Sequence, residues 1–467
     1  MSERFDPLYL KYILSLIHSK YQALPLKRLL SKPPQYGANE EGVLRTDLLQ
    51  PRYIRITDID EFGILKKELG FTAKVIDKKY ILNENDLLLA RSGNTVGKSY
   101  IHKKENIAEE CFFAGYMIRF VLNHELIMPD FVFYFTQLNP YKNWVNAIKR
   151  PTGQPNINAE EYKELKVPIL KLTEQKKIVS ILNDAYEGYK QSLNKAILLL
   201  NSIDDYLLKE LGIKLPKNKW SVLKYRVFLS NITEVAQQRL DPKGHHPYYD
   251  LLKESIKKCR YSVKPLTNLI SHFCNGDWGI DEEKIENPKL FERCLVIRST
   301  EIDNEFNINF ESGREKFRFI SKRKLETFNI KNNDILIERS GGSPDQPVGR
   351  VAFIEKPYIN NTRISFGNFL SKIKVNQEVD SSYLFNFLKT IHNIGLTEVM
   401  QTQTHGIRNL LIREYLSQFI PIPQLKKQHQ IAEHIAQIRS EAKRMREEAN
   451  KQLEEAKKEV EKMILGN

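Results

Sequence analysis

Residues 91–99, RSGNTVGKS, place glycine, lysine and serine close to the spacing of a phosphate-binding loop. Such a loop needs four residues between its first glycine and the Gly-Lys-Ser, followed by a helix, so that backbone N–H groups wrap the phosphates. Here only three residues separate Gly93 from Gly97, and the Tyr-Ile-His that follows favours a strand over a helix. The spacing therefore argues against a nucleotide hydrolase.

Other residues that could do chemistry lack partners at a useful spacing. A DNA methyltransferase needs an Asp/Asn-Pro-Pro-aromatic tetrapeptide, and the nearest strings, at 32–35 and 139–141, each lack required residues. His245 and His246 have no partner at triad or metal spacing, and no Gly-x-Ser-x-Gly elbow frames a serine. We therefore expect a protein that is not an enzyme and that binds no cofactor and no metal.

Length and composition indicate a basic protein of several domains. A chain of 467 residues exceeds one ordinary core, and a net charge of +14 makes a polyanionic partner plausible. No stretch approaches the roughly 20 apolar residues of a membrane span, and the first residues do not read as a secretory signal. The four cysteines are widely spaced, which favours free thiols and a cytoplasmic location.

The sequence is internally duplicated. Residues 334–341, DILIERSG, repeat residues 86–93, DLLLARSG. The second copy then inserts four residues and replaces Lys-Ser by Arg-Val, which a strand, a turn of variable length and a second strand can tolerate but a phosphate loop cannot. Further matches join 4–7 to 239–242, 54–60 to 297–303, and 167–169 to 420–422. The scaffold is kept while the loops diverge, as expected of two modules that do the same job on different targets.

Each copy ends in a long run of apolar residues at three- and four-residue steps. The first runs from Ile178 to Leu207, and the second from Ile431 to Met463. We expect the two helices to pair as an antiparallel coiled coil, although each stripe could instead pack against its own module. The positions assigned to the paired, partner-binding helices are Ile178, Leu182, Leu193, Leu200, Ile435, Ile438, Met445 and Leu453.

Several motifs occur in the same order in both copies: an Arg-x-Asp-Pro lead-in, Leu-x-x-Arg-Ser-Gly, and Val-Gly-Lys/Arg. A Thr-Gly-Gln-Pro-Asn-Ile loop, a Val-Pro-Ile or Ile-Pro-Ile-Pro strand and a Glu-Gln-x-x-Ile helix start complete the order. This order resembles the DNA-specificity subunit of Type I restriction-modification systems, twice over and along nearly the whole chain. The second copy departs at Lys427-Gln428 and at 405–409.

The resemblance implies two target recognition domains, each reading one half of a split, asymmetric DNA site. It also implies that the paired helices act as a spacer and as the docking surface for methyltransferase subunits, expected to number two, with endonuclease subunits joining through the complex. No membrane partner is expected.

DNA binding needs basic residues for phosphates and amides, arginines and hydroxyls for base edges. The loops 149–156 and 401–409 offer both kinds, although the same residues suit turns and caps. Features shared by both copies, such as Arg91 and Arg339, cannot by themselves read different sequences. The candidate DNA-contacting residues are Tyr36, Asn39, Arg45, Arg91, Lys98, Arg150, Thr152, Gln154, Asn156, Asn275, Trp278, Arg339, Arg350, Asn361, Arg363, Gln403, Thr404, His405 and Arg408.

We predict an α+β, internally duplicated chain with two α/β target recognition domains joined by two long antiparallel coiled-coil helices. The expected bounds are 1–173 and 213–426 for the domains, and 174–212 and 427–467 for the helices. The predicted function is a non-catalytic, sequence-specific DNA-binding subunit that directs methyltransferase and endonuclease subunits to a bipartite target. The alternatives are a DNA-modifying enzyme with an unrecognised site, or a coiled-coil scaffold or DNA-binding regulator.

Overall fold

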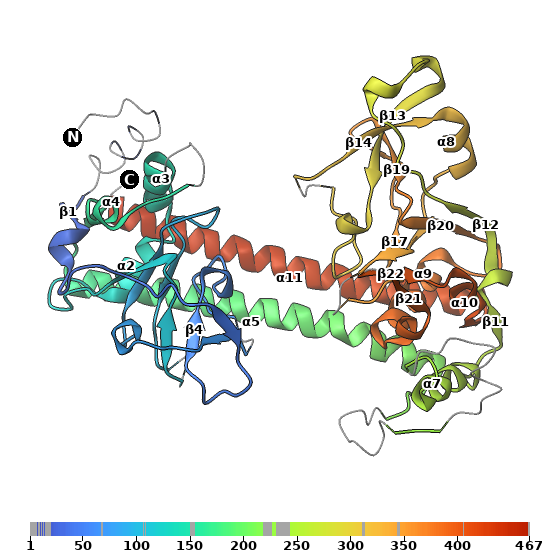
Figure 1. Ribbon diagram of the computed structural model, residues 1–467, viewed down its shortest axis with the longest axis horizontal. Coiled ribbons are helices and arrows are strands. Elements are labelled where there is room, and N and C mark those ends of the chain that lie inside the picture. The colour runs from blue at the N-terminus through green and yellow to red at the C-terminus, as the bar shows by residue number, and fades with distance from the viewer. Residues whose placement is uncertain are drawn as a thin grey trace. The chain divides into compact units, whose positions relative to one another are not determined.

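The computed structural model describes residues 20–465 and four residues near the start. The residues near the start are 7, 10, 12 and 14; the gaps within 20–465 are 67–68, 106, 108, 150–154, 218–226, 230–242, 311–312, 343–345 and 405. The chain forms two compact units, one of residues 1–194 with 444–467 and the other of residues 195–443, and each is described by itself. Figure 1 labels the helices and strands. In the described part of the chain, no helix is both long and apolar enough to cross a membrane.

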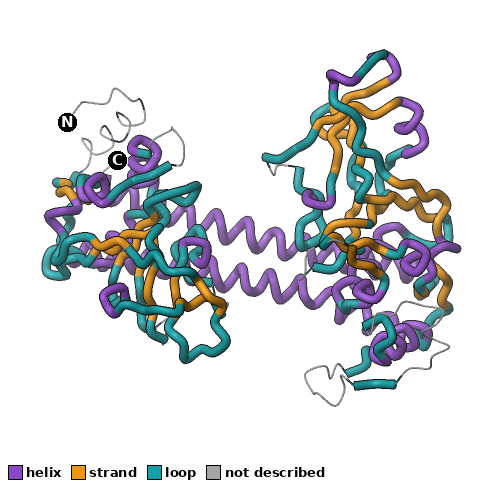
Figure 2. The backbone as a smooth tube through the Cα atoms, viewed as in Figure 1, coloured by secondary structure: helices purple, strands orange, loops and turns teal. Residues whose placement is uncertain are grey.

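The first unit contains two four-stranded sheets (Figure 2). The first sheet is antiparallel, and its strands in spatial order are β2 (Gln35–Tyr36), β9 (Met117–Phe120), β6 (Leu87–Ala90) and β7 (Ser99–Ile101). The second sheet includes a parallel pair, β4 with β8, and its order is β3 (Gly42–Leu44), β5 (Phe71–Ala73), β4 (Arg52–Ile54) and β8 (Cys111–Phe113). A separate pair joins β1 (Ala23–Pro25) to β10 (Lys166–Pro168).

The second unit repeats the antiparallel sheet and three strands of the mixed sheet, but the fourth strand of its mixed sheet lies at the opposite edge. Its antiparallel sheet has the order β12 (Ile270–Asn275), β20 (Leu370–Val375), β15 (Ile335–Glu338) and β17 (Val351–Phe353). Its mixed sheet, with a parallel pair β13–β19, has the order β14 (Phe317–Ser321), β13 (Phe291–Ile297), β19 (Thr362–Phe366) and β18 (Tyr358–Ile359). The pair β11 (Val263–Pro265) and β23 (Phe419–Pro421) matches β1–β10. A third sheet has the order β16 (Ser340–Gly341), β22 (Ile407–Leu410) and β21 (Gln401–Thr404).

Short helices complete both units. In the first unit they are α2 (Pro129–Phe135), α3 (Asn139–Ile148) and α4 (Ala159–Lys163), with 3-10 helices at Leu26–Leu29, Ile56–Asp58 and Lys78–Tyr80. In the second they are α7 (Pro247–Lys257), α8 (Lys322–Phe328), α9 (Ser381–Asn393) and α10 (Ile412–Ser417). Its 3-10 helices are Leu266–Leu269, Glu282–Lys284, Pro288–Leu290, Ser299–Glu301 and Leu396–Val399.

The predicted strand–turn–strand at the Arg-Ser-Gly motif is confirmed in both units. In the first, β6 and β7 pair antiparallel, with Leu87 opposite Ile101. In the second, β15 and β17 pair in the same way, with Ile335 opposite Phe353. Because a strand follows the turn, the Gly-Lys-Ser does not open a helix, and the nucleotide-hydrolase reading is excluded on geometry.

Two long helices contribute to both units. These are α5 (Leu172–Leu211) and α11 (Leu425–Leu465). In the first unit the early part of α5 shares a core with the late part of α11, for example Leu182 with Leu453. In the second unit the late part of α5 shares a core with the early part of α11, for example Leu207 with Ile435. This order of contacts makes the pair antiparallel, as predicted.

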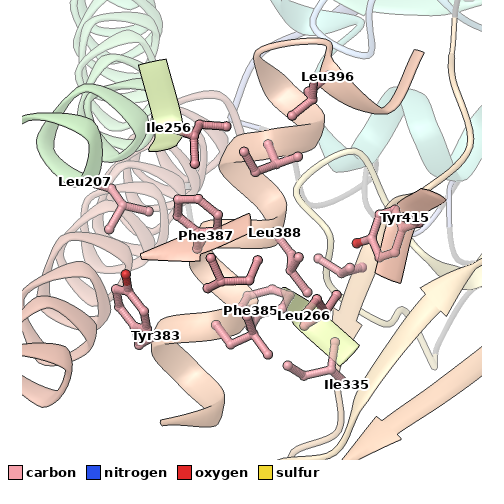
Figure 3. Close-up of a cluster of buried hydrophobic side chains, with 14 of the residues drawn as sticks. Leu207, Ile256, Leu266, Ile335, Tyr383, Phe385, Phe387, Leu388, Leu396 and Tyr415 are labelled. Carbon is pink, nitrogen blue, oxygen red and sulfur yellow. The ribbon is translucent and has the colours of Figure 1, made fainter. Parts of the chain in front are cut away.

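The core of the second unit shows how the helices are held. Leu207 of α5 lies in one buried cluster with Tyr383, Phe387 and Leu388 of α9 (Figure 3). Fully burying an aromatic or leucine side chain contributes about 1.5–3 kcal/mol. The helices are therefore part of the hydrophobic core of each unit. They pair with one another and also pack against the modules, so the two expected arrangements occur together.

One buried glutamine fixes the start of each long helix. Gln175 accepts a hydrogen bond from the Met128 N–H at 2.8 Å and donates to the Leu170 carbonyl at 2.8 Å. Gln428 likewise accepts from the Asp380 N–H at 2.8 Å and donates to the Pro423 carbonyl at 2.8 Å. Both side chains are fully buried. Each glutamine thus ties the beginning of α5 or α11 to the residue that precedes α2 or α9.

Candidate DNA-binding surface

The Arg-Ser-Gly turn meets the late, variable loop in both units. The Arg91 carbonyl accepts a hydrogen bond from the Ile157 N–H at 2.8 Å, and Ser92 forms an antiparallel bridge with Asn156. In the second unit the Arg339 carbonyl accepts from the Leu410 N–H at 2.7 Å, and the Ser340 hydroxyl donates to the Asn409 Oδ1 at 2.7 Å. The structure therefore brings together two segments that the sequence marks separately as candidate contacts.

In the first unit this junction carries an aromatic residue and an arginine. The Arg91 guanidinium lies 4.8 Å from the centre of the Tyr36 ring. The Tyr36 hydroxyl accepts a hydrogen bond from the Ala159 N–H at 3.1 Å, and the residue remains 40% exposed. Asn39 is exposed nearby in the chain. Tyr36, Asn39 and Arg91 are therefore placed where a ligand on the surface could reach them.

Two shared basic residues belong to the scaffold, which corrects their assignment as DNA contacts. The Lys98 ammonium donates to the Ile59 carbonyl at 2.7 Å, and burial lowers its pKa. Arg350 is buried and donates to the equivalent carbonyl, that of Ile302, at 2.7 Å, while it pairs with Glu338. Both side chains hold equivalent turns; Arg350 does so from a buried position and Lys98 from a half-buried one, which makes them weaker candidates for DNA contact.

Arg45 and Arg363 also point to protein partners. The Arg45 side chain is fully buried and donates to the Leu48 and Leu69 carbonyls at 2.7 and 3.0 Å. The Arg363 guanidinium forms an ion pair with Glu292 at 3.4 Å. Arg45 is therefore removed from the candidate contacts because its donors are used inside the unit. Arg363 is half-buried and keeps a lower priority.

The variable loops of the second unit are only partly exposed. Trp278, a predicted DNA contact, is half-buried against a hydrophobic cluster, and the Arg318 guanidinium lies 5.2 Å from its ring centre. Asn275 is exposed and accepts a hydrogen bond from the Ser371 hydroxyl at 2.9 Å. Asn361 is exposed in the turn between β18 and β19, where φ is +62°. Asn275 and Asn361 remain the accessible candidates of this group.

The remaining predicted contacts lie on or near the late loops. Gln403 is exposed on β21, Thr404 ends that strand, and Arg408 lies on β22. Arg150, Thr152, Gln154 and His405 fall outside the described residues. The structure thus places Gln403 on the surface of the second unit, in the same sheet as Ser340–Gly341 and separated from them by β22.

The positions predicted on the paired helices face inward. Ile178, Leu182, Leu453, Ile435 and Ile438 are buried within their own units, and Leu193, Leu200 and Met445 are half-buried. A stripe at this spacing predicts burial, but it does not say against which surface. A partner docking on the helices must use their outer faces, where Leu198 of α5 is 69% exposed.

The structure adds contacts for three pairs of equivalent groups that the sequence reasoning did not give. Buried ion pairs join Asp86 to Arg119 at 3.3 Å in the first unit and Asp334 to Lys372 at 2.8 Å in the second. The glutamines at the helix starts have the same contacts in both units. An exposed aromatic also occupies the same turn in both. The separation that relates residue 167 to residue 420 also relates Tyr116 to Phe369, so the aromatic pair could have been found from the sequence.

Among the described residues there is no cluster of three or more His, Cys, Asp or Glu side chains that could hold a metal ion. The structure has two matching scaffolds whose surface loops differ. This arrangement is typical of a duplicated protein that binds two related targets. The chemistry available at these loops is recognition by amide, hydroxyl, aromatic and guanidinium groups.

The Type I restriction modification DNA specificity domain matches residues 53–199 and again residues 299–455. These two matches cover more than half of the chain, and the chain therefore belongs to this family of DNA-specificity proteins. The resemblance inferred from the sequence and its internal repeat are both confirmed.

The chain is also similar to individual proteins. The chain is 24% identical over 425 residues to the Type I restriction enzyme MjaVIII specificity subunit of Methanocaldococcus jannaschii, covering 88% of this chain and 84% of that subunit. The S subunit of a Type I system from M. genitalium is 14% identical, with 96% of both chains covered and a TM-score of 0.42. A chain from a study of complex assembly in the type I restriction-modification system is 13% identical, with 96% of both chains covered and a TM-score of 0.48.

Proposed function

We propose that this chain is the non-catalytic subunit that selects the DNA target of a Type I restriction-modification complex. Each unit reads one half of a bipartite, asymmetric site, and the chain directs methyltransferase and endonuclease subunits to it. The single observation that supports this most is the duplication itself. The two units share an antiparallel sheet, a parallel strand pair, ion pairs and glutamine ties, and they differ in edge strands and in the loops that reach the surface.

The proposed modules follow the sequence-derived bounds. The first recognition domain is 1–173 and the second is 213–426, with spacer helices 174–212 and 427–467. The recognition surfaces are the junctions where the Arg-Ser-Gly turns meet the late loops. The residues proposed to contact DNA there and on the neighbouring loops are Tyr36, Asn39, Arg91, Arg150, Thr152, Gln154, Asn156, Asn275, Trp278, Arg339, Asn361, Arg363, Gln403, Thr404, His405 and Arg408.

Two methyltransferase subunits are the proposed stoichiometry, because two similar units give two similar docking surfaces. The outer face of α5 is one candidate for such a surface, since Ile197 and Leu198 are 41% and 69% exposed. Replacing Leu198 by aspartate is expected to reduce co-purification of the methyltransferase subunit. If co-purification is unchanged, docking uses another face.

Methylation mapping tests the function directly. Cells expressing this chain with its methyltransferase subunit are compared with cells lacking only this chain. We expect methylation at one split motif to disappear when the chain is missing. An unchanged methylation pattern, with the chain expressed and folded, would refute the proposal and favour a scaffold or regulator.

Separate variants in each unit then assign the half-sites. Asn39→Ala in the first unit should relax the sequence preference at one half of the motif only, and Gln403→Ala in the second should relax the other half. Each mismatched base pair at a specific site costs about 1–3 kcal/mol, so the relaxed positions will be visible in the map. If both variants affect the same half-site, the assignment of one half-site to each unit is wrong.

A further inference from the structure

An exposed aromatic residue occupies the same turn in both units. In the first unit Tyr116 lies between β8 and β9, and its carbonyl accepts a hydrogen bond from the Arg91 N–H at 2.9 Å. In the second, Phe369 lies between β19 and β20, and its carbonyl accepts from the Arg339 N–H at 2.7 Å. The two aromatics are therefore structurally equivalent, and each is tied to the Arg-Ser-Gly turn.

The turn exposes this side chain and little else that is large and apolar. Tyr116 is 62% exposed and Phe369 is 45% exposed. The residues that follow them, Met117 and Leu370, are buried at 1% and 0% exposure. The buried residue directly after the aromatic holds the backbone in place. The hydrogen bond donated by the arginine backbone N–H holds it as well. The ring is therefore presented on a fixed support.

The neighbours of the two aromatics are not the same. Gly115 precedes Tyr116, whereas Asn368 precedes Phe369. A single exposed aromatic is ordinary on a protein surface. An aromatic ring kept at one exposed position in two units, beside residues that have diverged, indicates a task that both units share.

That task cannot be the reading of different bases, because a shared group makes the same contact in both units. Contacts to sugar and phosphate position a protein on DNA and carry no sequence information. In single strands, bases stack on aromatic rings whatever the sequence; in a duplex the bases stack on one another, and the sugars of the backbone offer an apolar face that is the same for every sequence. We propose that Tyr116 and Phe369 are a matched pair of sequence-independent DNA contacts, each packing on the sugar–phosphate backbone of its half-site. This inference rests on the proposed function.

Binding assays on two duplexes test the pair. One duplex contains the motif found by methylation mapping, and the other contains the same bases in scrambled order. The full chain in complex with its methyltransferase subunit is titrated with each by fluorescence anisotropy. We expect Tyr116→Ala and Phe369→Ala each to weaken binding about tenfold on both duplexes, leaving the ratio of the two affinities unchanged. The double variant should be weaker still.

Control variants distinguish a loss of DNA contact from a nonspecific effect of removing any exposed apolar side chain. Tyr116→Phe should bind like the unchanged chain, because the ring is retained. Leu126→Ala and Leu251→Ala remove exposed apolar residues, 49% and 57% exposed, from the first and second units, and both should also bind like the unchanged chain.

Three results would overturn the inference. Unchanged affinity of both alanine variants would show that the rings do not contact DNA. A loss confined to the duplex with the motif would make them base readers. Loss of the methyltransferase subunit from the complex would make them a protein contact. If the unchanged complex itself shows no preference between the duplexes, the proposed function fails, and that result is distinct from all three.

Discussion

Gln428 offers the sharpest test of how the long helices are fixed. Replacing it by methionine keeps the volume and removes the amide that accepts from the Asp380 N–H at 2.8 Å. The same change removes the donor to the Pro423 carbonyl at 2.8 Å and to the Glu378 carbonyl at 3.1 Å. The Gln428 side chain is fully buried, so its former partners cannot simply turn to water.

The expected loss follows from the number of groups left without a partner. A buried polar group that loses its hydrogen bond costs about 1–3 kcal/mol. Gln428→Met should therefore destabilise the second unit by about 3 kcal/mol, which for a unit of this size lowers Tm by roughly 6–12 °C. Thermal unfolding followed by circular dichroism measures the shift. Hydrogen exchange localises it, because the first turn of α9 should lose protection.

Gln430→Met is the matched control. Gln430 lies two residues further along the same helix, and it is exposed. Its replacement should leave Tm within the error of the measurement. If Gln428→Met shifts Tm no more than Gln430→Met does, the glutamine does not fix the helix start, and the reasoning is refuted.

Three further predictions concern buried groups. Lys372→Met leaves the carboxylate of Asp334 buried without its partner and should destabilise the second unit by about 3–5 kcal/mol in urea unfolding; a neutral result would show that the pair is not needed. Burial lowers the pKa of His392 in the folded chain, so on acidification the unfolded chain binds a proton at a higher pH than the folded chain does. The free energy of unfolding should therefore fall as pH drops below about 6.5, by about 1.4 kcal/mol per pH unit for this group. His392→Gln should reduce that slope. Burial raises the pKa of Cys294 to about 12, so iodoacetamide at pH 8 should label Cys259 well before Cys294, as peptide mass spectrometry would show; equal labelling rates would contradict the burial argument.

The scaffold could be predicted from the sequence because the duplication presents each helix and strand pattern twice, in two different sequence contexts. The repeated Arg-Ser-Gly showed that residues 91–99 form a turn between strands. The two apolar stripes showed where long helices lie. Comparison of the copies thus tests a local pattern against a second context, which a single copy does not allow.

The hydrogen-bond and ion-pair partners of individual charged side chains could not be predicted in this way. Lys98 and Arg350 are basic residues at matching positions of the two copies, and both lie close to a loop. From the sequence alone, either side chain could bind a DNA phosphate or a backbone carbonyl. Their partners, Ile59 and Ile302, lie far from them in the chain and are brought near only by the tertiary fold. Arg45 was misassigned for the same reason. Its nearest acceptors include the Leu69 carbonyl on another segment.

The apolar stripes predicted the two long helices but not the surface against which each position packs. Periodicity fixes which face is buried, and Ile178 and Ile435 are indeed buried. It does not distinguish burial in a coiled coil, against a partner subunit, or in the core of the same unit. The structure uses both the partner helix and the unit's own core, which leaves the outer face for other proteins.

The division of α11 between the two units bears on how the chain is made. Leu453, Val460 and Ile464 complete the core of the first unit, whose other members come from residues before 195. A ribosome synthesises the chain from its N-terminus, so the core of the first unit lacks Leu453, Val460 and Ile464 until the second unit has been synthesised. The part of the protein that is translated first is therefore among the last to finish folding.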